Sequence, residues 1–290
     1  MGRKVKLMGG VGERSLGMEL RYRRTKAGIS MEKVGEALGW SANTISRLER
    51  GQRQETTPEE VSALLAVIGV TGDDRERLLK MAKGDTTHGW WEPNAAHLTD
   101  QARTYLRFEF KATRIIDVEP LLVPGLLQTP DYCRALMNAF GVEEHQVEGR
   151  IARRLGRQGL LTRAVAPDVI FIVTELMLRQ PFGGHEVMVR QVRHMAEVGE
   201  RPNVSIRVLP ASVVEHPGLL GGFVVLEFAD EAPVVFIEGR MSGMFPGNQE
   251  EVNDYGRTAE RLTSLALGEQ ESLELLHSIA EDHERARYRV

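Results

Sequence analysis

The first eighty residues place apolar side chains at helical spacing between groups of turn-forming residues, which predicts a series of short helices. The clearest of these helices follows Thr57-Pro58-Glu59-Glu60, a capping box with proline at the first helical position. Behind this box, four apolar residues recur at i, i+3, i+4 and i+7 and therefore share one helical face: Val61, Leu64, Leu65 and Ile68.

Serine residues mark the expected starts of three earlier helices, because a serine side chain can accept a hydrogen bond from the backbone of the first turn. Ser15 would begin a helix that turns Leu16 and Leu20 inward, directs its arginines outward and ends near residue 28. Ser30 would begin a second helix, and a glycine turn would separate it from a third, which Ser41 begins. A fifth helix is expected over residues 73–83.

Beyond residue 100 the pattern becomes mixed. Val204, Ile206 and Val208 alternate with polar residues, as in a half-buried strand. Two apolar runs are separated by the turn-like segment ADEAP and predict an antiparallel hairpin. The expected elements are a helix over 101–117, strands over 169–174 and 204–208, a helix over 186–199, hairpin strands over 223–228 and 234–238, and two C-terminal helices that end near residue 285.

These patterns predict a multidomain protein. Residues 84–100 combine Gly, Pro, Asn and Thr and are expected to form a linker, whose Trp90-Trp91 pair would pack against a neighbouring domain. The expected order is a flexible basic tail over residues 1–14, an all-α five-helix domain over 15–83, the linker over 84–100, and an α+β domain with a mixed or antiparallel sheet over 101–285.

Charge and composition narrow the class of protein. The net charge of the 290 residues is −4, yet residues 1–56 hold 12 Lys and Arg against 6 Asp and Glu, which indicates a negatively charged partner for that segment. No apolar run reaches the length of a membrane span, and the N-terminal residues lack the pattern of a secretory signal. The single cysteine, Cys133, excludes an internal disulfide and fits a reducing compartment. We therefore expect a cytoplasmic protein without a membrane partner.

The segment Ile29–Gly51, ISMEKVGEALGWSANTISRLERG, combines small residues at Gly35 and Ala37 with a glycine turn and a closing glycine. It resembles the lambda-repressor-like (XRE) helix-turn-helix family, and the resemblance covers about residues 15–83. This resemblance implies a DNA-binding domain whose second motif helix enters the major groove. It also implies a homodimer on a palindromic double-stranded operator, associated with the nucleoid. A helical protein-binding bundle with solvated arginines is the alternative.

Position in the motif gives the candidate DNA contacts. Asn43 would pair with adenine, and Arg47 with guanine or a phosphate. Ala42 and Met31 stand where the family often has glutamine, so one usual base contact and one usual phosphate contact are missing. The two helix starts at Ser30 and Ser41 would bind phosphate oxygens. The full candidate set is Arg21, Arg24, Ser30, Ser41, Ala42, Asn43, Thr44, Arg47 and Arg53.

Four later stretches resemble the C-terminal domain of XRE regulators from actinobacteria, chiefly streptomycetes: residues 119–132 (EPLLVPGLLQTPDY), 201–210, 216–228 and 235–239. Genes for such regulators commonly lie beside one for a small partner protein, and the pair has been likened to antitoxin and toxin. The resemblance implies a regulator whose C-terminal domain senses a small-molecule effector or docks a small partner protein. The alternative is an antitoxin-like protein that neutralises the partner and binds DNA to control its own expression.

The sequence predicts a protein that is not an enzyme, with no catalytic site, metal site or cofactor. It lacks a P-loop, a dinucleotide fingerprint and an HExxH motif, and its histidines lack metal-ligand spacing. The loop His216-Pro217-Gly218 is expected to be structural, with contact to a ligand as the alternative. An arginine stripe is expected to be exposed: Arg150, Arg153, Arg154 and Arg157.

Overall fold

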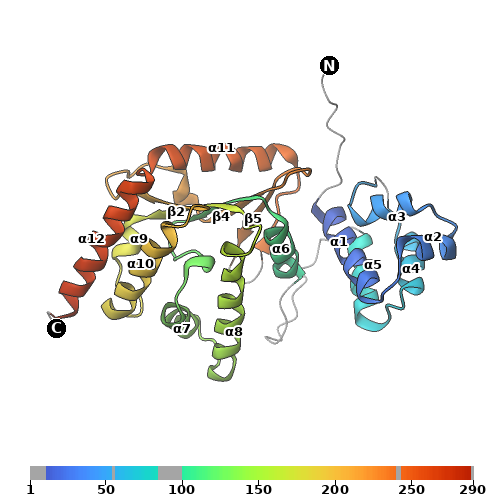
Figure 1. Ribbon diagram of the computed structural model, residues 1–290, viewed down its shortest axis with the longest axis horizontal. Helices are drawn as coiled ribbons and strands as arrows, with labels where there is room; N and C mark the ends of the chain where they lie inside the picture. Colours follow the sequence, from blue (N-terminus) through green and yellow to red (C-terminus); the bar gives the residue numbers. More distant parts are fainter. Residues whose placement is uncertain (1–10, 54–55, 84–99, 240–242, 289–290) are drawn as a thin grey trace, which may run out of the picture. The chain divides into compact units, whose positions relative to one another are not determined.

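The computed structural model describes residues 11–53, 56–83, 100–239 and 243–288 (Figure 1). The chain divides into two compact units, one of residues 1–107 with 239–248 and the other of residues 108–238 with 249–290. Residues 1–10 of the expected basic tail, the Trp90-Trp91 pair and nearly all of the expected linker lie outside the described residues. Within the described ranges, no helix is long and apolar enough to cross a membrane.

Five short helices form the N-terminal part of the first unit, as the sequence predicts. They are α1 (Val11–Lys26), α2 (Met31–Leu38), α3 (Ala42–Glu49), α4 (Pro58–Val67) and α5 (Gly72–Ala82). The side chains of Ser30, Ser41 and Thr57 each accept a hydrogen bond from the backbone three residues later, so the three expected caps are confirmed. The apolar faces of the helices meet in one buried core that contains the predicted stripe of Val61, Leu64, Leu65 and Ile68.

The first helix begins earlier than the sequence pattern predicts. Because α1 starts at Val11, Ser15 lies inside the helix, where it is buried, and the prediction that it caps the helix is wrong. Its Oγ lies 2.7 Å from Oγ1 of Thr104, a residue 89 positions away in the chain. A serine near a helix start can therefore serve a long-range contact, which the local pattern does not distinguish from a cap.

The remaining elements form the α+β part of the chain. They are α6 (Asp100–Lys111), within which the boundary of the two units falls, β1 (Arg114–Glu119), η1 (Gly125–Leu127), α7 (Pro130–Ala139), α8 (Glu144–Arg157), η2 (Gln158–Leu161), β2 (Asp168–Thr174), α9 (Glu175–Arg179), α10 (His185–Gly199), β3 (Val204–Leu209), η3 (Pro217–Leu220), β4 (Phe223–Glu227), β5 (Val234–Glu238), β6 (Gly243–Met244), α11 (Gln249–Leu265) and α12 (Glu269–Arg287).

The sheet is mixed, which confirms the expected fold class. Its strand order is β3-β2-β1-β4-β5-β6. β1 runs parallel to β2, and β2 runs parallel to β3, through connections that contain helices. β4 pairs antiparallel with both β1 and β5, so the predicted hairpin of β4 and β5 is confirmed. β1 therefore lies in the interior of the sheet, between a parallel and an antiparallel neighbour.

Helices lie on both faces of this sheet (Figure 1). α11 covers one face, where its Val252, Ala259 and Leu262 join Ile116 and Val118 of β1 in one buried cluster. α9 and α10 lie on the opposite face, and α12 packs along α10. Because β1 is covered on both sides, four of its six residues are buried in succession, as is typical of an interior strand.

The predicted helix over residues 101–117 is only partly correct. α6 ends at Lys111, and Ile115 and Asp117 belong to β1 instead. The β-branched residues of this segment gain a hydrogen-bonded strand on each side, which a continued helix would not provide. Phe110, near the end of α6, is 66% exposed.

The arginine stripe on α8 also differs from the prediction of an exposed face. Arg157 donates two hydrogen bonds to the buried Glu109, at 2.6 and 3.1 Å. Arg154 donates to Oε1 of the buried Gln128 at 2.5 Å. Half of the stripe therefore satisfies buried acceptors of its own unit.

Candidate nucleic-acid interface

The first turn of α3 is exposed and firmly capped. Oγ of Ser41 accepts a hydrogen bond from the backbone N–H of Thr44 at 3.1 Å, and the two hydroxyl oxygens lie 2.9 Å apart. The side chains of Asn43 and Arg47 are exposed, whereas Ala42 and Thr44 are half-buried. A helix N-terminus presents unpaired backbone N–H groups, so this turn offers hydrogen-bond donors to anionic groups and to base edges.

Glycines let α1 approach the C-terminal end of α3 closely. A Cβ at Gly17 would lie 2.6 Å from the carbonyl oxygen of Leu48 and 2.7 Å from that of Glu49. Gly51 has a φ of +62°, and a Cβ there would lie 2.6 Å from Cα of Arg14. The backbones themselves are in contact at these positions, and this contact fixes the direction of α3 against α1.

A buried ion pair reinforces this contact. Nε and Nη2 of Arg24 donate to the carboxylate of Glu49 at 2.5 and 2.9 Å, and Nη1 donates to the carbonyl oxygen of Ile29 at 2.8 Å. The hydrogen bond with Glu49 raises the pKa of Arg24 above its usual value, although burial acts in the opposite direction. The prediction that Arg24 faces outward to a phosphate is therefore wrong, because its guanidinium is enclosed and joins α1 to α3.

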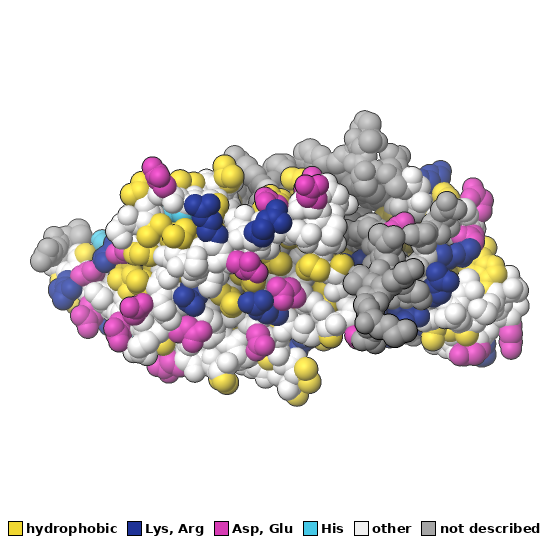
Figure 2. Space-filling model, turned by 90° about the horizontal axis from the view of Figure 1, so that it is seen from above, with side chains coloured by type: hydrophobic (Ala, Val, Ile, Leu, Met, Phe, Trp, Pro, Cys, Tyr) yellow, Lys and Arg dark blue, Asp and Glu magenta, His cyan; other side chains and the backbone are white. Residues whose placement is uncertain are grey.

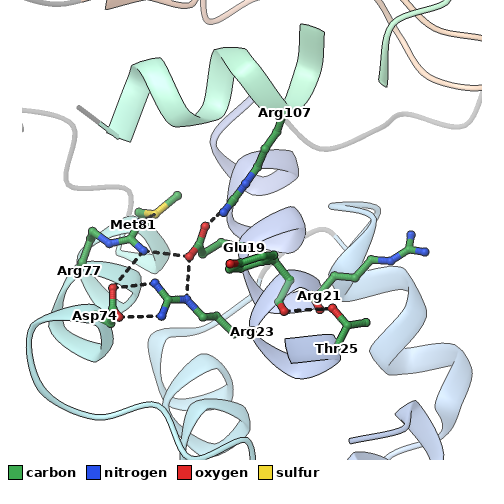
Figure 3. Close-up of polar contacts among 9 residues, drawn as sticks. Glu19, Arg21, Arg23, Thr25, Asp74, Arg77, Met81 and Arg107 are labelled. Carbon is green, nitrogen blue, oxygen red and sulfur yellow. Dashed lines mark hydrogen bonds and ion pairs between the residues drawn. The ribbon is translucent and has the colours of Figure 1, made fainter. Parts of the chain in front are cut away.

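The other two candidate arginines outside α3 differ from each other. Arg53 pairs with Glu60 of α4, and its guanidinium carbon lies 5.7 Å from the centroid of the Trp40 ring. It is half-buried and takes part in the packing of its own unit. Arg21 is exposed, and Figure 3 shows its guanidinium directed away from the charged cluster beside it.

That cluster is centred on the buried carboxylate of Glu19 (Figure 3). Arg23 and Arg77 each donate to Glu19 at 2.9 Å, Arg107 forms a third pair with it, and Asp74 binds Arg23 at 2.6 and 2.7 Å. Burial by itself would raise the pKa of Glu19, but the arginines outweigh burial and lower the pKa to about 2. One carboxylate therefore joins α1, α5 and α6.

Two exposed cations of the motif were not among the candidates predicted from sequence. Arg50 is exposed directly after α3, and its Nε donates to the carbonyl oxygen of Ser46 at 3.1 Å. Lys33 is exposed in the first turn of α2. Arg50 could have been predicted from its spacing to Arg47, because residues three apart lie on one side of a helix.

The candidate interface is therefore a small set of exposed polar side chains on a rigid helical support. The structure brings Ser41, Asn43, Thr44 and Arg47 together on α3 and places Ser30 at the start of α2. Throughout the described part of the chain, no group of three or more His, Cys, Asp or Glu side chains could hold a metal ion. The geometry suits hydrogen bonding and charge pairing with an elongated polyanion.

Comparison with protein families finds two separate matches along the chain. A helix-turn-helix domain matches residues 15–78, which run from within α1 to within α5, and this match supports a regulator of XRE-like type that binds DNA. A domain of unknown function (DUF5753) matches residues 102–278. Neither a curated protein nor a solved structure matches the chain. Because the second match covers more than half of the residues, the chain belongs to the family defined by this domain of unknown function (DUF5753), and a helix-turn-helix domain precedes that domain.

Proposed function

We propose that this protein is a sequence-specific transcription regulator that inserts α3 into the major groove of double-stranded DNA. The proposal rests on two features that α3 combines. Its first turn is capped and exposes Asn43 and Arg47. Its other end is held by the close contact at Gly17 and by the Arg24–Glu49 pair. A major groove admits one α-helix, and the N-terminal side chains of that helix then face base edges.

Each exposed side chain has a distinct role in this proposal. Asn43 offers both a donor and an acceptor, which match adenine, and Arg47 offers two parallel donors, which match guanine. Thr44 and Ala42 contribute shorter-range contacts with the groove. Phosphates are contacted by the backbone amides at the starts of α2 and α3, and by exposed cations such as Arg21. The hydroxyls of Ser30 and Ser41 act as caps in the structure, so we assign phosphate binding there to the backbone N–H groups.

We further propose that two copies bind a palindromic operator, because α3 has eight residues and its first turn can read few base pairs. A second copy doubles the recognised sequence, with half-sites about one helical turn apart. The DUF5753 domain would then regulate DNA affinity by sensing a ligand or by docking a small partner protein. Regulation of this kind is reciprocal, so DNA would change the affinity for the effector by the same factor.

The test is selection of genomic DNA fragments by the full-length protein, followed by titration of the best site with variants. Arg47→Ala is expected to weaken binding to this site by about tenfold or more. Asn43→Ala is expected to relax the preference at one base position in each half-site. Lys80→Ala is the matched control, because it removes one exposed cation from α5 without touching α3.

The outcomes separate base reading from general charge attraction. If Arg47→Ala and Lys80→Ala weaken binding equally on all sequences, Arg47 contributes charge alone and the proposed groove contact is refuted. If no fragment is enriched over random DNA, sequence-specific binding itself is refuted. Light scattering of the complex measures whether two copies occupy one site, and a single copy would overturn the dimer proposal.

A further inference from the structure

A cavity lies at one edge of the sheet in the second unit. It has a volume of about 430 Å³ and is bounded by η3, by the start of β4, by the end of β5 and by the first half of α11. This volume falls in the range of small-molecule sites in proteins, about 300 to 1,000 Å³. Pro217 of the loop His216-Pro217-Gly218 lines the cavity, so one residue of this loop lies at the candidate ligand site.

The position of the cavity in the topology favours a ligand. Because β4 is antiparallel to β1 and Phe223 of β4 pairs with Val118, the cavity lies at the carboxyl end of β1. From β1 the chain passes to β2 on one side, and β4 later pairs on the other side, so the order of strands reverses there. In open sheets with parallel strands, ligands bind outside the carboxyl ends of strands at such a reversal. Here the parallel strands β1 and β2 end at this edge, and the antiparallel strand β4 begins there.

The floor of the cavity is apolar and aromatic. The rings of Phe223 and Tyr255 meet edge to face with centroids 4.9 Å apart, and Ile237 continues the apolar surface. Leu220 lies at the edge of the cavity, and 96% of the surface of this apolar residue is exposed to solvent. Figure 2 views this unit from the side of α11 and shows apolar side chains at the surface between acidic and basic ones.

Glycine at the entrance is required by the backbone. A Cβ at Gly222 would lie 2.8 Å from the carbonyl oxygen of Val118, and Gly221 has a φ of +118°. Side chains at these two positions would therefore strain the chain, and their absence leaves the entrance open. The open entrance of the cavity is thus a consequence of the two glycines that precede β4.

The wall formed by α11 is acidic. It carries Glu250, Glu251 and Asp254 together with the cation Arg257, which pairs with Asp254 at 2.8 Å. Acidic residues in the first turn of a helix stabilise that helix, which accounts for the first two. Asp254 lies beyond the first turn, and the described lining of the cavity contains three carboxylates and one guanidinium group. An apolar aromatic floor beneath such a wall fits a positively charged group on an apolar body, and Tyr255 adds an attractive ring for a cation.

We propose that this cavity binds a small organic cation, an amine or amidine on an apolar body, and that this ligand is the effector sensed by the DUF5753 domain. The binding itself stands independently, whereas the effector role rests on the proposed function. The apolar body occupies the Phe223–Tyr255 floor, and the cationic group faces Glu250 and Asp254.

The test uses matched probes on the full-length protein. 2-Phenylethylamine, 4-phenylbutylamine, hexylamine and benzamidine are compared with the neutral 2-phenylethanol, 4-phenylbutanol and hexanol by saturation-transfer NMR and calorimetry. The amines are expected to bind more tightly than the alcohols of the same body, and their affinity is expected to fall as salt is added. Glu250→Gln and Asp254→Asn are each expected to weaken amine binding by roughly two- to fivefold, as for partly exposed charges.

Glu260→Gln is the matched control, because it removes one exposed carboxylate from the same helix outside the cavity lining. The proposal is overturned if none of the four cations binds, if alcohols bind as well as amines, or if Glu260→Gln has the same effect as Glu250→Gln. DNA affinity is measured on the same preparations with and without 2-phenylethylamine. Amine binding that leaves DNA affinity unchanged refutes the effector role alone, whereas failure to bind DNA refutes the proposed function whatever the amines do.

Discussion

Replacing Glu19 by glutamine removes the charge at the centre of the cluster that joins α1, α5 and α6. The carboxylate is 3% exposed and is paired with Arg23, Arg77 and Arg107. Glutamine has nearly the same shape, so the substitution leaves the packing and changes the charge. Three guanidinium groups then lose their common anion, although Arg23 and Arg77 keep Asp74 as a partner.

The expected loss follows from the pKa of this carboxyl group. A decrease from the ordinary 4.5 to about 2 corresponds to about 3 kcal/mol of stabilisation near neutral pH. Between pH 4.5 and pH 2 the folded protein binds fewer protons at Glu19 than the unfolded chain does. The stabilisation is therefore complete above about pH 5 and is lost as the pH falls toward 2. Because glutamine can still accept one hydrogen bond, we expect a loss of about 2–3 kcal/mol at pH 7.

Urea unfolding at pH 7, 5, 4 and 3.5 measures this difference, with hydrogen exchange of the α1 and α5 amides as the local readout. Glu76→Gln is the control, because it neutralises an exposed carboxylate on α5 beside the cluster. The difference between wild type and Glu19→Gln is expected to shrink steadily below pH 5. A loss that is the same at every pH would refute the electrostatic account, since only the ionised carboxylate stabilises the fold in this reasoning.

Three further substitutions, the first with a matched control, test the packing and the buried charge. Gly17→Ala is expected to destabilise the helical domain by about 1–3 kcal/mol in urea unfolding, because the added Cβ would meet the backbone of α3. Gly12→Ala in the same helix is the control: its Cβ would meet nothing within 4 Å, and it is expected to be neutral or stabilising. Leu64→Ala is expected to cost about 2–5 kcal/mol through a core cavity, and a negligible change in the unfolding midpoint would contradict the assigned face of α4. Burial, with Glu109 nearby, raises the pKa of Asp117 above its ordinary value. The free energy of unfolding therefore falls as the pH rises above the ordinary pKa of aspartate. Asp117→Asn is expected to be more stable than wild type at pH 8, by a margin that is smaller at pH 4.

The elements predicted correctly are those whose signals are local. Caps at Ser30, Ser41 and Thr57 involve residues three positions apart, and the stripe in α4 repeats within three turns. The β4–β5 hairpin is similarly local, since its strands are joined by a short turn. Sequence patterns of this kind locate the helix-turn-helix and the exposed side chains of α3, because exposure follows directly from helical spacing.

The predictions that failed depend on contacts between distant residues. Arg24 and Glu49 are 25 positions apart, and nothing in the spacing of either residue shows that they form a buried pair. An arginine on an amphipathic helix has the same local pattern whether it faces solvent, a phosphate or a buried carboxylate. The segment from Gln101 to Asp117 also depends on context, since its last four residues belong to a strand that pairs with residues more than fifty positions away. The cavity beside α11 arises from the strand order, which the sequence patterns do not determine.

An eight-residue helix has little stability by itself, so the orientation of α3 must come from its surroundings. Those surroundings act on its buried side and on its C-terminal end, through Leu48, the Gly17 contact and the Arg24–Glu49 pair. None of these contacts uses the exposed side chains of Asn43 or Arg47. Under the proposed function, changes at those two positions are expected to alter which DNA is bound at little cost to the fold. Changes at Arg24 or Gly17 are expected to disturb the fold and the interface together. Under the proposed function, this separation would let one scaffold present different recognition residues, and the specificity for DNA would then lie in the first turns of α3.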